Sequence, residues 1–93
     1  MSEIWMALTL KIEYLDGAPL IAYLTLPHPA RLKSHHVRKF PPDLIVDFSR
    51  GGRPLGIEIL APRHTSLAAL NRVMKRLKLP PLRRRDIAPL RAA

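Results

Sequence analysis

The sequence predicts an α+β fold in which a four-stranded antiparallel sheet, made of two β-hairpins, is covered by one C-terminal helix and followed by a basic tail. Three observations predict this fold. Apolar and polar residues alternate over residues 5–15, two turn signals separate short apolar runs, and apolar residues recur at helical spacing over residues 67–77. A chain of 93 residues has the size of a single domain, which we assign to residues 1–79, with residues 80–93 as the tail.

The first hairpin is predicted from residues 5–26. Every second side chain of residues 5–15 is apolar, as in a long half-buried strand with one face formed by Met6, Leu8, Leu10, Ile12 and Tyr14. Asp16 and Gly17 then accept the positive φ angles of a tight turn, and the apolar run Leu20–Leu26 follows. Two such runs around a turn are expected to pair as antiparallel strands.

Residues 27–42 interrupt this alternation with four prolines and three histidines. Proline cannot donate a hydrogen bond to a neighbouring strand, so we expect a loop or an irregular edge segment here. A second hairpin follows, with strands at Leu44–Phe48 and Leu55–Leu60 and a turn in which Gly51 and Gly52 supply positive φ angles. That turn predicts the facing pairs Val46 with Ile57, Phe48 with Leu55, Asp47 with Gly56, and Glu58 with Ile45.

The helix is predicted between Pro62 and Pro80. Thr65 or Ser66 can cap its first turn, and the helix is expected to run to about Lys78. One apolar stripe at helical spacing consists of Leu67, Leu70, Val73, Met74 and Leu77. The tail after the helix shows no sustained period, so we expect it to be frayed or to dock on a neighbouring chain.

The composition excludes several kinds of site and cellular location. The chain has no cysteine, which excludes disulfides and thiolate metal sites and fits a reducing compartment. No apolar run approaches the roughly 20 residues of a membrane span, and the N-terminus lacks the basic region of a secretory signal. We therefore expect a cytoplasmic protein that does not bind membranes.

The positive charge is concentrated near the C-terminus. Residues 1–62 hold seven Lys and Arg against six Asp and Glu, a net charge of +1, and residues 63–93 hold nine against one, a net of +8, which together give +9. Such asymmetry indicates a polyanion or an acidic partner. The candidate nucleic-acid-binding residues are Arg72, Lys75, Arg76, Arg83, Arg84 and Arg85.

No catalytic, metal or cofactor site is predicted. His35 and His36 are adjacent, so they point to opposite faces of a strand and lack the spacing of a helical zinc pair; we interpret the histidines as exposed loop residues. Asp47 and Glu58 are expected on one face of the second hairpin, where carboxylates can act as acid and base. We favour instead an ion pair with Arg50, Arg53 or a loop lysine, and we do not expect an enzyme.

Aromatic residues also bear on the binding mode. The chain has five Phe, Trp and Tyr residues in total, of which Trp5 and Phe40 are expected to be exposed. Proteins that bind single strands stack bases on several exposed aromatic rings. The sequence therefore predicts phosphate contacts rather than base stacking, if the partner is a nucleic acid.

Part of the chain resembles a known family. The run Gly56–Leu60 and the strand that ends at Asp47 resemble the small bacterial family called domain of unknown function 2283, as do Tyr14, Asp16 and Tyr23 in the first hairpin. The resemblance covers about residues 8–73. It implies a β-rich domain with a terminal helix and, because some members are encoded beside toxin-like genes, an antitoxin or partner-binding role. The insertion at residues 27–42 and the basic end depart from the family, and antitoxins are more often acidic.

Two functional hypotheses follow. The first is a non-enzymatic protein-interaction module, an antitoxin-like partner of a small toxin or of another small acidic protein. The alternative is a protein that binds RNA or DNA through its basic C-terminal third. In either case we expect a homodimer, because residues 5–15 form a strand longer than the strands of the second hairpin. Its unpaired length would expose a sheet edge, which natural proteins cover.

Overall fold

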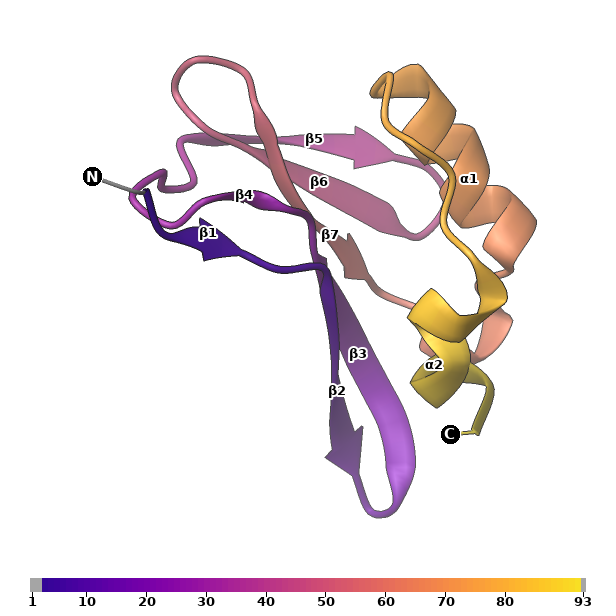
Figure 1. Cartoon of the computed structure of the whole chain (residues 1–93). Helices are drawn as coiled ribbons and strands as arrows, with labels where there is room; N and C mark the ends of the chain where they lie inside the picture. The colour runs from indigo at the N-terminus through magenta and orange to yellow at the C-terminus, as the bar shows by residue number, and fades with distance from the viewer. Residues whose placement is uncertain (1–2, 93) are drawn as a thin grey trace.

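A computed structural model describes residues 3–92 of the chain and shows an α+β fold (Figure 1). Its main sheet is fully antiparallel, with the strand order β2-β3-β7-β6-β5. The strands of this sheet are β2 (Thr9–Leu15), β3 (Ala18–Thr25), β5 (His36–Phe40), β6 (Leu44–Phe48) and β7 (Pro54–Ile59). A separate two-stranded sheet pairs β1 (Trp5–Met6) with β4 (His28–Pro29). The prediction of a single four-stranded sheet is therefore wrong in strand number.

The first hairpin forms as predicted, but its first strand is shorter. Asp16 and Gly17 have φ angles of 51° and 79°, the left-handed values of a two-residue hairpin turn. The expected strand over residues 5–15 is divided at Ala7 and Leu8, because β1 leaves the main sheet and pairs with β4. The register shifts once in this hairpin, where Leu20 of β3 has no partner on β2.

The second hairpin has the predicted register over most of its length. Val46 faces Ile57, as expected, but Phe48 faces Pro54 rather than Leu55, because the register shifts between Asp47 and Phe48. Only Gly52 of the glycine pair has a positive φ angle, 92°. The turn is closed by the Ser49 side chain, whose Oγ accepts a hydrogen bond from the Arg53 N–H at 3.1 Å.

Residues 27–42 are more regular than predicted. They contain β4 and the edge strand β5, which pairs with β6 so that Arg38 faces Val46. All four prolines lie outside β5, so the segment between them can form a complete ladder on one side. Of the two alternatives expected here, a loop or an irregular edge segment, the structure shows the edge position, as a regular edge strand flanked by proline-rich turns.

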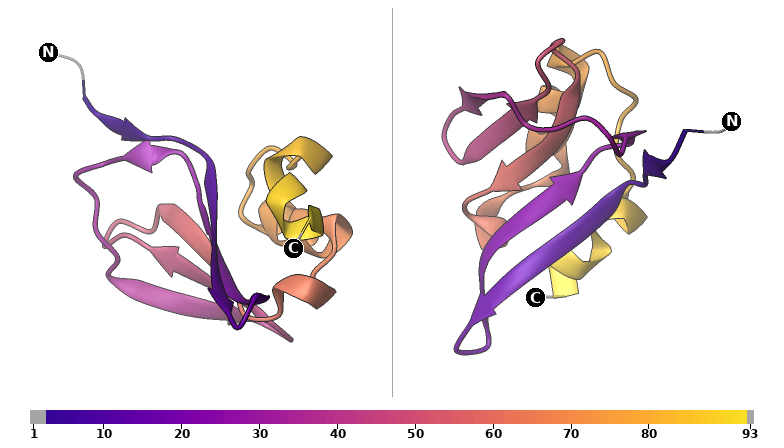
Figure 2. Two further views of the ribbon diagram at one scale, coloured as in Figure 1. Left: turned by 90° about the horizontal axis from the view of Figure 1, so that it is seen from below. Right: turned by 90° about the vertical axis from the view of Figure 1, so that its left-hand side faces the viewer.

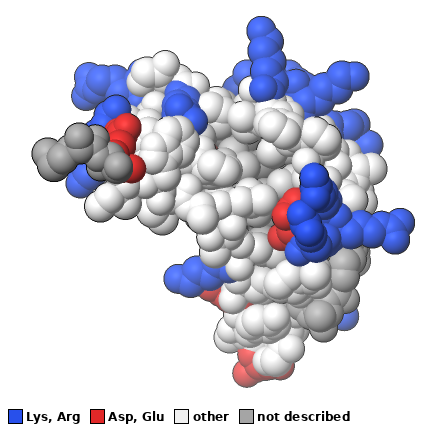
Figure 3. Space-filling view, in the orientation of Figure 1, with Lys and Arg blue, Asp and Glu red and all other residues white. Residues whose placement is uncertain are grey.

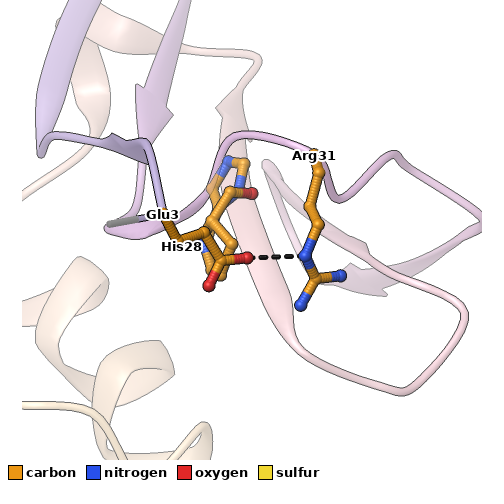
Figure 4. A network of polar contacts seen from close by, with 4 residues as sticks. Glu3, His28 and Arg31 are labelled. Atoms are coloured by element: carbon orange, nitrogen blue, oxygen red, sulfur yellow. Dashed lines mark hydrogen bonds and ion pairs between the residues drawn. The ribbon is translucent and has the colours of Figure 1, made fainter. Parts of the chain in front are cut away.

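The helices and the N-terminal arm complete the fold. They are the 3₁₀ turns η1 (Pro62–His64) and η2 (Arg84–Ile87) and the α-helices α1 (Leu67–Arg76) and α2 (Ala88–Ala92). Ser66 caps α1 by accepting a hydrogen bond from the Ala69 N–H at 3.0 Å, and α1 ends two residues before the predicted Lys78. At the other end of the chain, Glu3 and Arg31 form an ion pair beside the buried His28 (Figure 4).

Both helices pack on the same side of the sheet (Figure 2). The predicted stripe of α1 is confirmed, since Leu70, Val73 and Met74 are buried and Leu67 and Leu77 pack against the core. The largest fully buried side chains are Leu24, Leu26, Val46, Ile57, Ile59, Leu70 and Ile87. No described helix covers the opposite face of the sheet, where the side chains that alternate with the core residues face outward.

The C-terminal segment differs from the expected frayed or intermolecular tail. Leu82, Ile87 and Leu90 belong to the core that the sheet and α1 form. Asn71 of α1 holds the segment in place, because its Oδ1 accepts from the Leu82 N–H at 2.7 Å and its Nδ2 donates to the Leu82 carbonyl at 3.1 Å. No helix among the described residues is both long and apolar enough to cross a membrane.

Candidate nucleic-acid interface

A basic cavity lies between α1 and the turn that follows β5. Its volume is about 360 Å³. The cavity is lined on one side by residues 40–44 and on the other by the end of η1, the two residues that follow it, and one face of α1. Its titratable lining residues are Asp43, His64, Arg72 and Arg76. Two guanidinium groups and one imidazole thus share this cavity with a single carboxylate.

Phe40 connects the strand β5 to the basic side of α1. This residue is 4 % exposed, which corrects the expectation of an exposed aromatic residue. The guanidinium carbons of Arg38 and Arg76 lie 4.8 Å and 5.0 Å from the centre of its ring. Both distances are within the range of a cation–π interaction. One buried ring therefore positions two arginines that come from distant parts of the sequence.

The structure divides the six predicted binding residues into separate groups. Arg72 and Arg76 line the basic cavity, whereas Lys75 lines a different hollow with Lys78. The arginines 83–85 are exposed at the start of η2. In Figure 3, Lys and Arg side chains gather over the upper part of α1 and, separately, over the η2–α2 segment.

Two further basic residues join the first of these groups. We define the α1 patch as the exposed side chains of Arg38, His64, Arg72 and Arg76. The sequence prediction omits Arg38 because it treats residues 27–42 as a loop or an irregular edge segment rather than as a regular strand. In a strand, Arg38 and Phe40 share a face because they are two residues apart. Recognising β5 would have placed Arg38 beside α1.

Few acidic groups offset this charge. Among the side chains of residues 3–90, the one ion pair within 4.0 Å joins Arg31 to Glu3, far along the chain from α1. Arg38 and Arg76 lie over the Phe40 ring rather than beside carboxylates, so their charge is available to a ligand. A guanidinium carries donors in a planar fork that matches the oxygens of a phosphate.

The outer face of the sheet carries a hydrogen-bond network instead of the expected ion pair. Tyr23 donates to Oδ2 of Asp47 at 2.8 Å, and the Ser34 hydroxyl lies 3.3 Å from Oδ1. Tyr23 reaches Asp47 across β7 because the residue between them is Gly56. A Cβ atom at Gly56 would lie 2.1 Å from the Tyr23 oxygen, which no side chain tolerates. Asp47 is thus bound to neutral hydroxyls rather than to Arg50 or Arg53.

This network predicts a pH dependence at high pH. Burial, then the hydrogen bond to Asp47, raises the pKa of the Tyr23 hydroxyl above its ordinary value of 10.0. Because folding favours the protonated phenol, its contribution to stability is complete below about pH 10 and decreases as the pH rises above that value. Urea unfolding should therefore show a falling free energy of unfolding above about pH 10. The Tyr23→Phe variant, which lacks the phenolic hydroxyl, should lose this part of the decrease in the free energy of unfolding.

The four histidines lie in different surroundings, although the neighbouring rings of His35 and His36 meet edge to face with centres 5.8 Å apart. His28 is buried, which differs from the expected exposed position, and its Nδ1 lies 2.8 Å from the Pro29 carbonyl oxygen. His36 stacks on Phe48 with ring centres 5.2 Å apart. Within residues 3–92, no group of three or more His, Asp or Glu residues is arranged to hold a metal ion.

Comparisons with family models, curated proteins and solved structures found no match to the chain. The resemblance to domain of unknown function 2283 therefore stays a prediction that rests on the sequence runs alone. Function must be inferred from the physical properties of the surface. The basic side of α1 is the surface with the most distinctive chemistry.

Proposed function

We propose that this chain is a non-enzymatic nucleic-acid-binding domain that contacts phosphate groups through the α1 patch. The observation that carries the proposal is a convergence of arginines: Arg72 and Arg76 line a cavity with a single carboxylate, Asp43, and Arg38 shares the Phe40 ring with Arg76. A net charge of +9 on 93 residues also supports a polyanionic partner, because it attracts such partners over long range.

The aromatic residues support backbone contacts rather than base stacking. Phe40 is buried beneath the patch, and Trp5, which is 50 % exposed, lies on β1. In Figure 1, β1 and α1 lie on opposite sides of the molecule. The patch itself thus offers charge and donors without an exposed Phe, Tyr or Trp ring. We expect it to bind the phosphate backbone of a duplex with little sequence preference.

A second candidate function is the binding of an acidic protein, which the same charge would also favour. The planar fork of arginine suits carboxylates as well as phosphates. The regular spacing of phosphates along a duplex favours the nucleic acid, because a small basic domain can make several equivalent contacts there.

Salt dependence tests the proposal. Each phosphate that a basic side chain neutralises releases counterions, so affinity falls steeply as salt concentration rises. With about four to six contacts, the affinity for duplex DNA or RNA should fall on the order of 10²–10³ between about 50 and 200 mM salt. Fluorescence anisotropy of a labelled duplex measures this directly. Absence of binding at the lower salt concentration would show that the patch is only a solvated surface.

A further inference from the structure

The strand β2 forms one edge of the main sheet. In the strand order β2-β3-β7-β6-β5, no described strand pairs with the outer side of β2. The right-hand view of Figure 2 shows the broad face of β2, with β3 along one side of it and no strand along the other. An uncovered edge strand presents unpaired N–H and C=O groups that can pair with another strand.

We propose that two copies of the chain pair through β2, antiparallel and about a two-fold axis that passes beside Ile12. In this register each Ile12 faces the Ile12 of the second copy, and the two five-stranded sheets become one continuous sheet. The arrangement is closed, as most homodimers are, because the same strand is used by both copies. The side chains that this register brings together support it.

Charge complementarity is the first argument. In an antiparallel pair centred on residue 12, Lys11 lies opposite Glu13 of the second copy, and Glu13 lies opposite its Lys11. Both side chains are exposed on the outer face of the sheet. Two oppositely charged cross-strand pairs therefore form at once, and such pairs stabilise a sheet, whereas like charges directly opposite each other destabilise it.

The inner face of β2 gives the second argument. In the same register Leu10 faces Tyr14 of the second copy, on the side where Leu10 and Ile12 already pack against the core. Tyr14 is 53 % exposed in the single chain. Pairing would cover this apolar surface, and aromatic–aliphatic cross-strand pairs are favourable.

The other edge of the sheet does not fit a second copy. β5 has the sequence His-Val-Arg-Lys-Phe and contains no acidic residue. Antiparallel self-pairing of β5 about its centre would set Arg38 opposite the Arg38 of the second copy. Charged edge strands are one means by which proteins prevent such pairing. Self-pairing thus brings opposite charges together at β2 and like charges together at β5. Two copies can therefore form a closed dimer through β2, and the sheet does not extend further through β5.

A charge-swap experiment tests the register. Positions 11 and 13 face each other at two places in the dimer. Either single substitution, Lys11→Glu or Glu13→Lys, puts like charges together at both places, so each variant should dimerise at least about tenfold more weakly than the wild type. A mixture of the two variants should form a heterodimer, because positions 11 and 13 are then both acidic in one chain and both basic in the other. Sedimentation equilibrium should give the wild type a mass of twice 10.5 kDa.

A matched control uses the other edge. Lys39→Glu on β5 also replaces an exposed lysine by glutamate and should leave the dimer unchanged. In addition, the chain has no native cysteine, so Ile12→Cys should form an intermolecular disulfide under mild oxidation, while Arg38→Cys, at the centre of β5, should not. A monomeric wild type, or single charge variants that dimerise as strongly as the wild type, would overturn the proposal. Neither result depends on nucleic-acid binding, because β2 and β5 are opposite edges of the sheet.

Discussion

A chain that ends at Leu79 should fail to fold. The truncation removes Leu82, Ile87 and Leu90, which are 5 %, 1 % and 3 % exposed in the core. Loss of one buried leucine or isoleucine side chain costs about 2–5 kcal/mol, and a small domain has only about 5–15 kcal/mol of stability in total. Removing three such side chains therefore exceeds what the domain can lose. Far-UV circular dichroism and its thermal melt measure the outcome.

The control for this truncation keeps the core and removes only charge. Replacing arginines 83–85 by alanine leaves the three buried side chains in place, so its thermal melt should resemble that of the wild type. Ile87→Ala is a milder test of the same core and should lower the free energy of unfolding by about 2–5 kcal/mol. A truncated chain that melts cooperatively at the wild-type temperature would show that residues 80–93 are dispensable, as the sequence alone suggested.

The sequence prediction of a frayed tail is wrong for a physical reason. Helices and strands are recognised in a sequence by periodic apolar residues, and Leu82, Ile87 and Leu90 follow no single period. They are buried because Asn71 fixes the chain at Leu82 and because η2 and α2 turn the segment back toward the sheet. These are tertiary contacts, so the burial of the three side chains cannot be predicted from the sequence of the tail alone.

Local sequence patterns are sufficient to predict the structure where the chain forms regular hairpins and helices. The turn at Asp16 and Gly17 and the cap at Ser66 follow from local chemistry, and the structure confirms both. The strand β5 is not predicted because its flanking prolines dominate the composition of residues 27–42. Burial of Phe40 is not predicted for the same reason, since its position depends on β5. The α1 patch could therefore be predicted only in part, as Arg72 and Arg76 without Arg38.

Reversing the charge of Arg72 and Arg76 should remove most of the affinity for nucleic acid. Both side chains line the basic cavity and are exposed, so the Arg72→Glu/Arg76→Glu variant should remain folded. Each reversal replaces an attraction to phosphate by a repulsion, which amounts to roughly 2 kcal/mol for a solvent-exposed charge near a phosphate. The two reversals together should weaken binding on the order of 10²–10³ at low salt.

Net charge alone would also weaken binding, so the control must change the charge equally. Arg83→Glu/Arg84→Glu makes the same change in net charge at the start of η2, away from the cavity that Arg72 and Arg76 line. Residual long-range attraction would decrease in both variants, but only the first removes direct contacts of the α1 patch. Comparing the affinities of the two variants distinguishes the loss of direct contacts at the α1 patch from the general effect of a lower net charge.

The most direct measurement is the fluorescence anisotropy of a labelled duplex titrated with the wild type and with these two variants at about 50 mM salt, where phosphate contacts are strong. We expect tight binding by the wild type, a loss on the order of 100-fold or more for Arg72→Glu/Arg76→Glu, and a loss of less than about tenfold for Arg83→Glu/Arg84→Glu. Equal losses in the two variants, or no binding by the wild type, would contradict the assignment of the α1 patch as a nucleic-acid interface.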